Sequence, residues 1–240
     1  MTIGKFRIAA AAALLAGGCF VSAAAHAQDA TVLFTGIDAR DKSYYGYVGA
    51  IHHLSGNLTD DSFLLRADGL YGQYDYQSSA VAGGKVDGDV RSFDVLGGYQ
   101  KAFESFFLRG YAGLEFEDHS LSPDNVLDSN RGSDFGVKVM GQFETALTLP
   151  YYADLIASYG SAKERYWTRL RGGYNFSGYV VGPEALATGN DESSEQRLGA
   201  FLMLTNLGQF GLTMSGGYSD TDENRGGSSA YGTLELSTTF

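Results

Sequence analysis

The carboxy-terminal stretch of the chain alternates between apolar and polar side chains up to its last residue, Phe240. Its apolar face carries Ala230, Gly232, Leu234 and Leu236, and its polar face carries Glu235, Ser237 and Thr239, with Tyr231 as the exception. A period of two is the period of a β-strand with different surroundings on its two sides. A strand of this kind that ends in an aromatic residue is typical of the last strand of bacterial outer-membrane β-barrels.

The same alternation recurs upstream roughly every 15–20 residues, which predicts an all-β chain. We expect an antiparallel transmembrane β-barrel of about 12 strands. The expected strands span residues 31–39, 43–54, 62–76, 86–102, 105–117, 133–149, 151–161, 165–176, 179–190, 194–207, 209–221 and 228–240. In the ninth of them Gly182-Pro183 predicts a bulge or kink, because proline cannot donate to the ladder.

The composition also favours strands over helices. The chain has 33 Gly, 16 Tyr and 15 Phe residues, and many are adjacent, as in Gly98-Tyr99 and Gly110-Tyr111. So many glycines would weaken helices. In a closed sheet a glycine leaves a notch that an aromatic ring on a neighbouring strand can cover, which lets the sheet curve.

The amino terminus has the pattern of an export signal. Lys5 and Arg7 precede an apolar run, and Ala25-His26-Ala27 is a small-x-small cleavage site. We expect residues 1–27 to be a cleaved signal peptide and residues 28–240 to form the barrel. Lipoprotein processing at Cys19 is disfavoured, because Ala16 stands where a bulky aliphatic residue is needed.

Charge and cysteine content exclude several classes of function. After cleavage the chain has 15 basic against 28 acidic residues, a net charge of −13, and no cysteine. An acidic exported chain without a basic cluster is a poor candidate for binding nucleic acid. Disulfides and thiolate chemistry are excluded as well.

The expected connections alternate between tight turns and longer polar loops from the third strand onward. This asymmetry is typical of outer-membrane barrels, with turns in the periplasm and loops outside, and an even strand count then puts both termini in the periplasm. The linker 55–61 is unusually long for the periplasmic side. Periodicity alone would also fit a soluble sandwich, but the signal, the final Phe and the loop asymmetry favour the barrel, with apolar faces on outer-membrane lipid.

The polar strand faces then line the lumen. Twelve residues form this predicted polar network: Arg66, Asp68, Asp94, Arg109, Tyr111, Glu115, Lys138, Glu144, Asp154, Arg169, Arg171 and Glu184. A tight turn at Ser177-Gly178 places Arg171 opposite Glu184, where an ion pair is geometrically reasonable. The mixed signs favour a network that braces the barrel over a polar track along a pore.

The sequence does not support catalysis. His52, His53 and His119 are the only histidines after the signal, and we expect them to be solvated or at a rim, with His119 in a long outer loop. Glu115 and Glu117 share a face, but two carboxylates at that spacing are common in a hydrated lumen. No Gly-x-Ser-x-Gly, metal-ligand spacing or cofactor motif occurs. We therefore expect no catalytic residue, metal or cofactor.

Exposed aromatic residues admit two interpretations. Tyr71, Tyr74 and Tyr76 near the outer end of one strand, with Tyr166 and Trp167 near another loop, would form an interfacial girdle. They would equally offer flat faces on which sugar rings stack. The girdle needs fewer assumptions.

Several segments resemble the bacterial cellulose biosynthesis protein BcsS family. They are Tyr-Tyr-Gly-Tyr-Val-Gly at 44–49, Phe-Leu-Leu-Arg-Ala-Asp-Gly-Leu-Tyr-Gly at 63–72, Leu-Gly-Gly-Tyr at 96–99, Leu-Ser-Pro-Asp at 121–124, Gly-Pro-Glu-Ala at 182–185 and Arg-Leu-Gly at 197–199. The resemblance covers essentially the whole chain after the signal, while the acidic loop expected at 117–128 has no explanation in it.

The resemblance implies an outer-membrane accessory protein of a cellulose synthase system, without a catalytic residue to carry over. We expect it to assist export or surface anchoring of cellulose or another glucan, in contact with other synthase components. The alternatives are a small general or oligosaccharide-selective channel and a lipid-modifying barrel enzyme.

Overall fold

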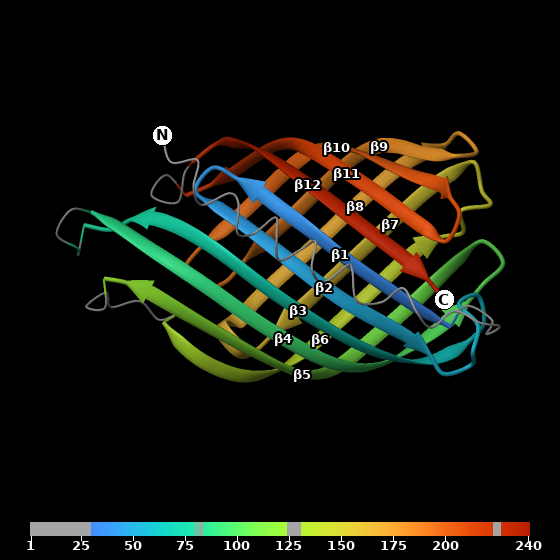
Figure 1. The fold of residues 1–240 in the computed structure, drawn as a ribbon, viewed down its shortest axis with the longest axis horizontal. Helices are drawn as coiled ribbons and strands as arrows, with labels where there is room; N and C mark the ends of the chain where they lie inside the picture. The colour runs from blue at the N-terminus through green and yellow to red at the C-terminus, as the bar shows by residue number, and fades with distance from the viewer. Residues whose placement is uncertain (1–29, 80, 82–83, 124–130, 223–226) are drawn as a thin grey trace.

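The computed structural model describes residues 30–79, 81, 84–123, 131–222 and 227–240 (Figure 1). The predicted signal peptide, residues 1–27, lies outside this part of the chain. The strands are β1 (Thr31–Arg40), β2 (Ser43–His53), β3 (Ser62–Gln77), β4 (Lys85–Ala102), β5 (Phe106–Ser122), β6 (Gly132–Thr145), β7 (Tyr151–Gly160), β8 (Arg165–Asn175), β9 (Tyr179–Gly189), β10 (Ser194–Leu207), β11 (Phe210–Thr221) and β12 (Ser229–Thr239). A short 3₁₀ turn, η1 (Ala162–Glu164), lies between β7 and β8.

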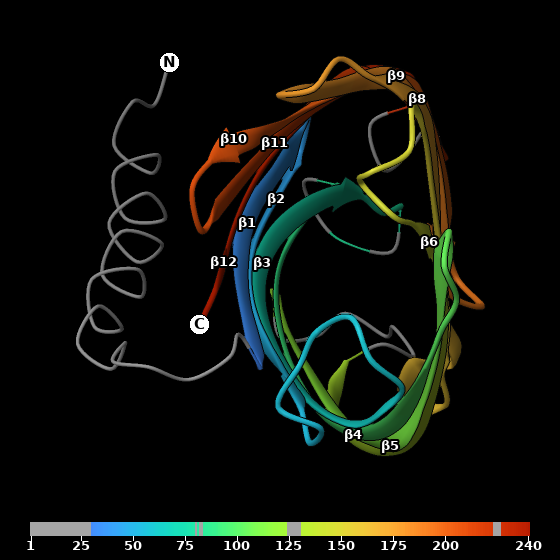
Figure 2. The ribbon, with the colours of Figure 1, turned by 90° about the vertical axis from the view of Figure 1, so that its right-hand side faces the viewer.

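The strands form one closed barrel in which each strand pairs antiparallel with its neighbours in sequence (Figure 2). β1 closes the ring against β12, in a register that runs from Val32 opposite Thr239 to Arg40 opposite Tyr231. Closure leaves no sheet edge along the ring, which is what a sheet in lipid requires. The predicted fold class, an antiparallel transmembrane β-barrel, is confirmed. Within the described residues, no helix has the length and hydropathy needed to cross a bilayer.

The faces of the wall are the reverse of those in a water-soluble domain. Outward-facing apolar side chains are highly exposed, such as Phe135 at 79%, Leu198 at 71% and Leu114 at 69%, while Asp94 and Asp154 are 4% and 2% exposed. Large apolar groups on the surface and buried charges inside are the expected arrangement when the surroundings are lipid.

The two ends of the barrel differ. β1 begins and β12 ends at one end, which we call the turn end, and the opposite end is the loop end. β3, β4 and β5 are 16, 18 and 17 residues long, whereas β7 has only 10, and the longer strands extend further at the loop end. The wall is therefore taller on the β3–β5 side (Figure 1).

The loop predicted after the fifth strand is shorter than expected. β5 continues to Ser122, so residues 117–122 of the expected acidic loop are strand, paired with β4 throughout and with β6 as far as His119. Residues 124–130 lie outside the described part of the chain. β6 in turn ends at Thr145 and not at 149, because 146–150 form the turn to β7.

Of the bulge or kink predicted at Gly182-Pro183, the bulge is wrong. The pairing of β8 with β9 is interrupted between Arg171–Glu184 and Tyr174–Val181, but it resumes in the same register. The missing N–H of the proline therefore removes local bonds without adding a residue. A register shift occurs elsewhere, between Leu204 and Leu207 where β10 pairs with β11.

The predicted outer girdle is largely wrong, because Tyr74 and Tyr76 face inward. Tyr76 is 6% exposed within an apolar cluster, and Tyr74 packs against that cluster. Trp167 shares the inward face with Arg169, whose guanidinium lies 5.5 Å from its ring. Only Tyr71 and Tyr166 of the five face outward, with 42% and 38% exposure.

An aromatic belt lies instead at the turn end. Its ring contacts, with centroids 4.4 to 5.7 Å apart, are Phe103–Phe106, Phe106–Phe143, Tyr151–Tyr174, Tyr174–Phe176 and Phe176–Tyr179. Aromatic residues at this level are typical of the membrane–water interface.

Inward-facing rings cover glycines on neighbouring strands, as the composition predicted. The pairs are Tyr47 over Gly36, Phe34 over Gly49, Tyr45 over Gly72, Tyr74 over Gly88, Tyr111 over Gly98 and Tyr231 over Gly199. A Cβ on Gly98 would lie 2.5 Å from the Tyr111 ring and 2.5 Å from the Gly110 carbonyl oxygen. Only a residue without Cβ fits there.

We predict that Gly98→Ala lowers the unfolding free energy of the barrel by about 1–3 kcal/mol, because the ring and backbone must move. Gly97→Ala is the matched control, since its outward-facing Cβ would meet nothing within 4 Å. Urea unfolding in lipid vesicles measures both. Equal losses for the two variants would contradict the role assigned to the notch.

Candidate functional site: the polar interior

Charged side chains reach across the interior between strands that are not neighbours. Arg171 on β8 donates to Glu235 on β12 at 2.6 Å, and Arg197 on β10 donates to Asp38 on β1 at 2.5 Å. Three strands separate the first pair along the sheet and two the second. Such contacts are possible only if these side chains point into the barrel.

The structure joins ten of the twelve predicted network residues in ion pairs. The pairs are Arg66–Asp68 at 2.7 Å, Lys138–Asp94, Arg109–Glu144 at 2.7 Å, Arg169–Asp154 at 3.3 Å and Arg171–Glu184 at 2.5 Å. The other two, Glu115 and Tyr111, are also buried on the inward face. Most of the predicted charges are therefore paired locally along the interior.

The register predicted from the turn after β8 is confirmed, with Arg171 opposite Glu184. Both side chains are 3% exposed or less, and Arg171 Nε donates to Glu184 Oε2. Glu184 also accepts hydrogen bonds from Ser215 and from Tyr231, each at 3.0 Å. A buried ion pair is stable only when its remaining hydrogen-bonding capacity is used, and here it is.

Glu235 is the centre of this group, and the sequence analysis did not include it in the network. It accepts from Arg169 Nη1 at 3.1 Å and from Arg171 Nη2 at 2.6 Å, which brings two guanidinium groups to one carboxylate. The alternation of β12 placed Glu235 on the polar face. Only the three-dimensional closure of the barrel brings it to β8.

Tyr231, the exception in the pattern of β12, is explained by the same group. It faces inward with 5% exposure and its hydroxyl donates to Glu184 Oε1. Its ring also covers Gly199 and lies 5.0 Å from the guanidinium of Arg197. The ring of Tyr231 thus covers the space above Gly199, and its hydroxyl supplies a hydrogen bond to the Arg171–Glu184 ion pair.

A second group near β1 and β10 was also missed. Arg197 donates to Asp38 and to Glu195, at 2.5 and 2.6 Å. Glu195 further accepts from Ser219 at 2.6 Å and lies 3.2 Å from Arg40. The alternation of these strands was the available signal for their inward position.

A chain of hydrogen bonds lies toward the loop end, and it corrects the prediction for His119. His119 lies on β5, is 9% exposed, and is not in a loop or solvated. Its Nδ1 lies 2.8 Å from the Tyr74 hydroxyl and its Nε2 lies 2.8 Å from Glu117 Oε1. Arg165 on β8 lies 3.2 Å from the other oxygen of Glu117. The four residues link β3, β5 and β8.

Glu115 and Glu117 are not a free pair of carboxylates. Glu117 bonds His119 and Arg165, while Glu115 accepts the backbone N–H of Ala162 in η1 at 2.7 Å. His53, near the turn end, is 3% exposed and faces inward, so it is not at a solvated rim either. Within the described residues, no group of three or more His, Cys, Asp or Glu side chains could hold a metal ion.

The interior is not polar throughout. Leu64, Leu96 and Tyr111 form one inward apolar cluster, and Tyr152, Val180 and Phe201 form another. The alternation rule assigns a lipid face and a lumen face, but it does not say where the lumen is dry. These clusters are the part of the interior that the polar-lumen interpretation missed.

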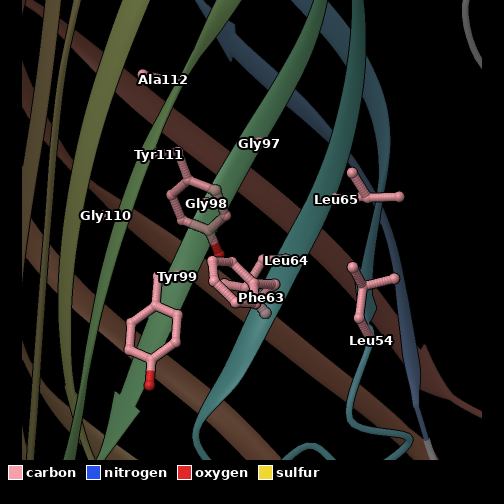
Figure 3. A pocket seen from close by; sticks show the side chains of 10 residues that line it. All are labelled: Leu54, Phe63, Leu64, Leu65, Gly97, Gly98, Tyr99, Gly110, Tyr111 and Ala112. Atoms are coloured by element: carbon pink, nitrogen blue, oxygen red, sulfur yellow. The ribbon is translucent and has the colours of Figure 1, made fainter.

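One groove of about 680 Å³ lies in the wall on its outward side (Figure 3). Gly97 and Gly110 leave it open, and Phe63, Leu65 and Tyr99 surround it. Its lining is almost entirely apolar, so it offers contact with lipid and no convergent polar groups.

Solved structures similar to this chain are outer-membrane barrels. An outer membrane channel from Pseudomonas putida F1 has a TM-score of 0.53 and 16% identity, covering 91% of this chain and 97% of that chain. The β domain of the Bordetella autotransporter BrkA has a TM-score of 0.52 and 12% identity, covering 89% of this chain and 100% of that chain. A KdgM porin has a TM-score of 0.47 and 11% identity, covering 87% and 99%. At these identities the likeness to the first two structures shows the fold alone, that of an outer-membrane β-barrel.

The family is shown by sequence. The family described as cellulose biosynthesis protein BcsS matches residues 32–240, so the chain belongs to it, as the resemblance predicted. No curated protein matches the chain.

We predict that Arg171→Ala lowers the unfolding free energy by about 3–5 kcal/mol, because it leaves Glu184 buried without its cation. Adding Glu184→Ala should cost much less than Glu184→Ala alone, since the stranded carboxylate is gone. A double-mutant cycle by urea unfolding measures the coupling.

The matched control is Lys101→Ala, which breaks the Lys101–Asp61 pair, an exposed pair with side-chain exposures of 53% and 39%. Surface pairs contribute little, so this variant should unfold like the wild type. Strictly additive losses at Arg171 and Glu184 would contradict the coupling.

Proposed function

We propose that the protein is a non-catalytic outer-membrane accessory of bacterial cellulose biosynthesis. It assists export or surface anchoring of the glucan and contacts outer-membrane lipid, the glucan and other components of the synthase. In this proposal residues 1–27 are removed as a signal peptide, and the turn end with both termini of the barrel faces the periplasm.

Family membership supports the cellulose pathway, and the interior supports the non-catalytic role. Among the described residues, every inward-facing arginine and lysine has a carboxylate within ion-pair distance: Arg40, Arg66, Arg109, Lys138, Arg165, Arg169, Arg171 and Arg197. Buried ion pairs that are also hydrogen-bonded, such as Arg171–Glu184, make a structure rigid. The paired charges therefore act as a brace for a scaffold, and they leave only a small excess of negative charge to select ions.

The lipid-modifying enzyme is the less favoured alternative. An acid–base catalyst needs a group that can reach a substrate proton. His119 has both ring nitrogens within hydrogen-bond distance of other side chains, and Glu117 has both oxygens bonded or ion-paired. This arrangement supports a structural role for the His119 chain, which ties the tall side of the wall to β8.

We predict that deleting the gene lowers surface cellulose while leaving phospholipid acylation unchanged. Cellulose is measured separately on cells, in the medium and in the periplasm. Loss from cells with a gain in the medium indicates anchoring, whereas loss from both with periplasmic retention indicates export. Normal amounts in every fraction would overturn the proposal.

We predict that His119→Ala restores cellulose to the deletion strain as well as the wild-type gene does, because the residue is not assigned to chemistry. The variant should still lower barrel stability, since Glu117 and Tyr74 lose a partner. A folded His119→Ala barrel that fails to restore cellulose would contradict the non-catalytic assignment.

A further inference from the structure

Two inward-facing amide side chains bind connecting turns at the turn end of the barrel. Gln100 on β4 donates from Nε2 to the carbonyl oxygens of Leu58 and Asp60, both at 2.8 Å. Asn175 on β8 donates from Nδ2 to the carbonyl oxygens of Leu147 and Leu149, at 2.6 and 3.3 Å. The turns concerned, 54–61 and 146–150, lie on different sides of the ring.

The first turn is longer than its connection requires. Antiparallel neighbours can be joined by two residues, as at β10–β11 of this barrel. The extra residues of 54–61 instead cross in front of the barrel opening in the end-on view, on the side of β3 and β4 (Figure 2). This placement gives the long linker noted in the sequence a structural role.

Burial shows that the 54–61 turn covers the interior. Gln100, Ser62 and His53 lie within the last residues of their strands at this end, yet they are 0%, 3% and 3% exposed. Inward side chains at the open mouth of a water-filled barrel would be hydrated. These side chains are not.

Apolar side chains lie directly inside both turns. Leu64 at 1% exposure is two residues from the start of β3, and Val180 at 0% is the second residue of β9. Tyr152, the second residue of β7, packs with Val180 and Phe201. Two turns thus lie at the turn end next to two dry patches of the interior.

Polar contacts hold the first turn in place. Arg109 donates to Gln100 Oε1 at 2.6 Å and to Glu144 at 2.7 Å, so the amide is oriented by the ion-pair network. Asp61, the last residue of the turn, accepts from Lys101 at 2.5 Å and from the N–H of Ala102 at 2.8 Å. The hydrogen bond from Lys101, with that from Ala102, holds the pKa of Asp61 below its ordinary value.

We propose that turns 54–61 and 146–150 form a gate over the turn end of the lumen, latched by Gln100 and Asn175, and that the barrel passes uncharged polar solutes when the latch is released. Amide–carbonyl hydrogen bonds suit a latch, because water can replace each of them at small net cost. The inward carboxylates named above outnumber the inward cations by only two, so the interior carries a small net charge, and uncharged solutes such as sugars are the fitting class. The gate does not depend on the role in cellulose biosynthesis.

The test compares wild-type protein with Gln100→Leu/Asn175→Leu, each reconstituted as the whole processed chain in liposomes. Swelling in arabinose, sucrose and raffinose, and conductance in KCl across planar bilayers, report opening. We expect the double variant to exceed the wild type by on the order of tenfold or more, because each lost hydrogen bond shifts the closed–open equilibrium by up to about tenfold. The control is Gln196→Leu, an exposed residue on the outward face of β10, which should behave as the wild type.

A second variant keeps the proposal falsifiable if the leucines disturb folding. Deleting residues 56–60 removes the first turn while leaving the wall, and it should also raise swelling. Heat-modifiable migration in gels verifies that each barrel is folded. Folded variants that swell no faster than the wild type would overturn the gate, as would a wild-type barrel that already passes raffinose as fast as they do. Neither result bears on the cellulose phenotype of the deletion strain.

Discussion

The closure of the sheet is the constraint on which the rest of the structure depends. In a bilayer no water is available to backbone N–H and C=O groups, so every strand needs two hydrogen-bonded neighbours. The pairing of β1 with β12 supplies the last of these contacts. Once the ring is closed, alternation turns one face of each strand to the interior, and the buried charges of the barrel lie on that face.

The interior charges follow from that confinement. A charge enclosed by the wall is costly unless it is paired and hydrogen-bonded, and removing one partner is costlier than removing both. In the group around Glu235 the burial cost is offset by several contacts per charge. Arg169 and Arg171 both bind the Glu235 carboxylate, and Glu184 accepts hydrogen bonds from Ser215 and Tyr231. The contacts join β8, β9, β11 and β12, so the same contacts that neutralise charge also hold strands together that are not neighbours in the sheet.

The sequence predicts what is local and periodic. Alternation yielded the strands, the inward position of residues such as Asp94 and Lys138, and the Arg171–Glu184 register, because each follows from a period of two and a tight turn. It could not yield the contact of Arg169 with Glu235, since that distance depends on how the closed ring is shaped. His119 was misplaced for a related reason: β5 continues beyond the membrane-facing apolar run, and a polar strand there has the composition of a loop.

The inward turn of Tyr74 and Tyr76 shows the limit of composition as a guide. Tyrosine at a strand end suits an interface, but Gly88 opposite leaves a notch that only the inward side of the sheet presents. The Tyr74 ring covers Gly88 on the inward side, so Tyr74 is not part of an outward-facing girdle. The position of Gly88, and not the presence of Tyr74 at a strand end, indicates the side of the sheet on which the ring lies.

The unequal height of the wall has a geometric consequence. β5 pairs with β6 as far as His119 opposite Gly132, whereas β7 stops where Gly160 meets Lys138. Six residues of β6 separate those levels, which at about 3.3 Å per residue is a step of roughly 20 Å along the strand. The rim at the loop end is consequently slanted and stands higher on the β3–β5 side, so a large molecule that approaches along the barrel axis from that end contacts the β3–β5 side first.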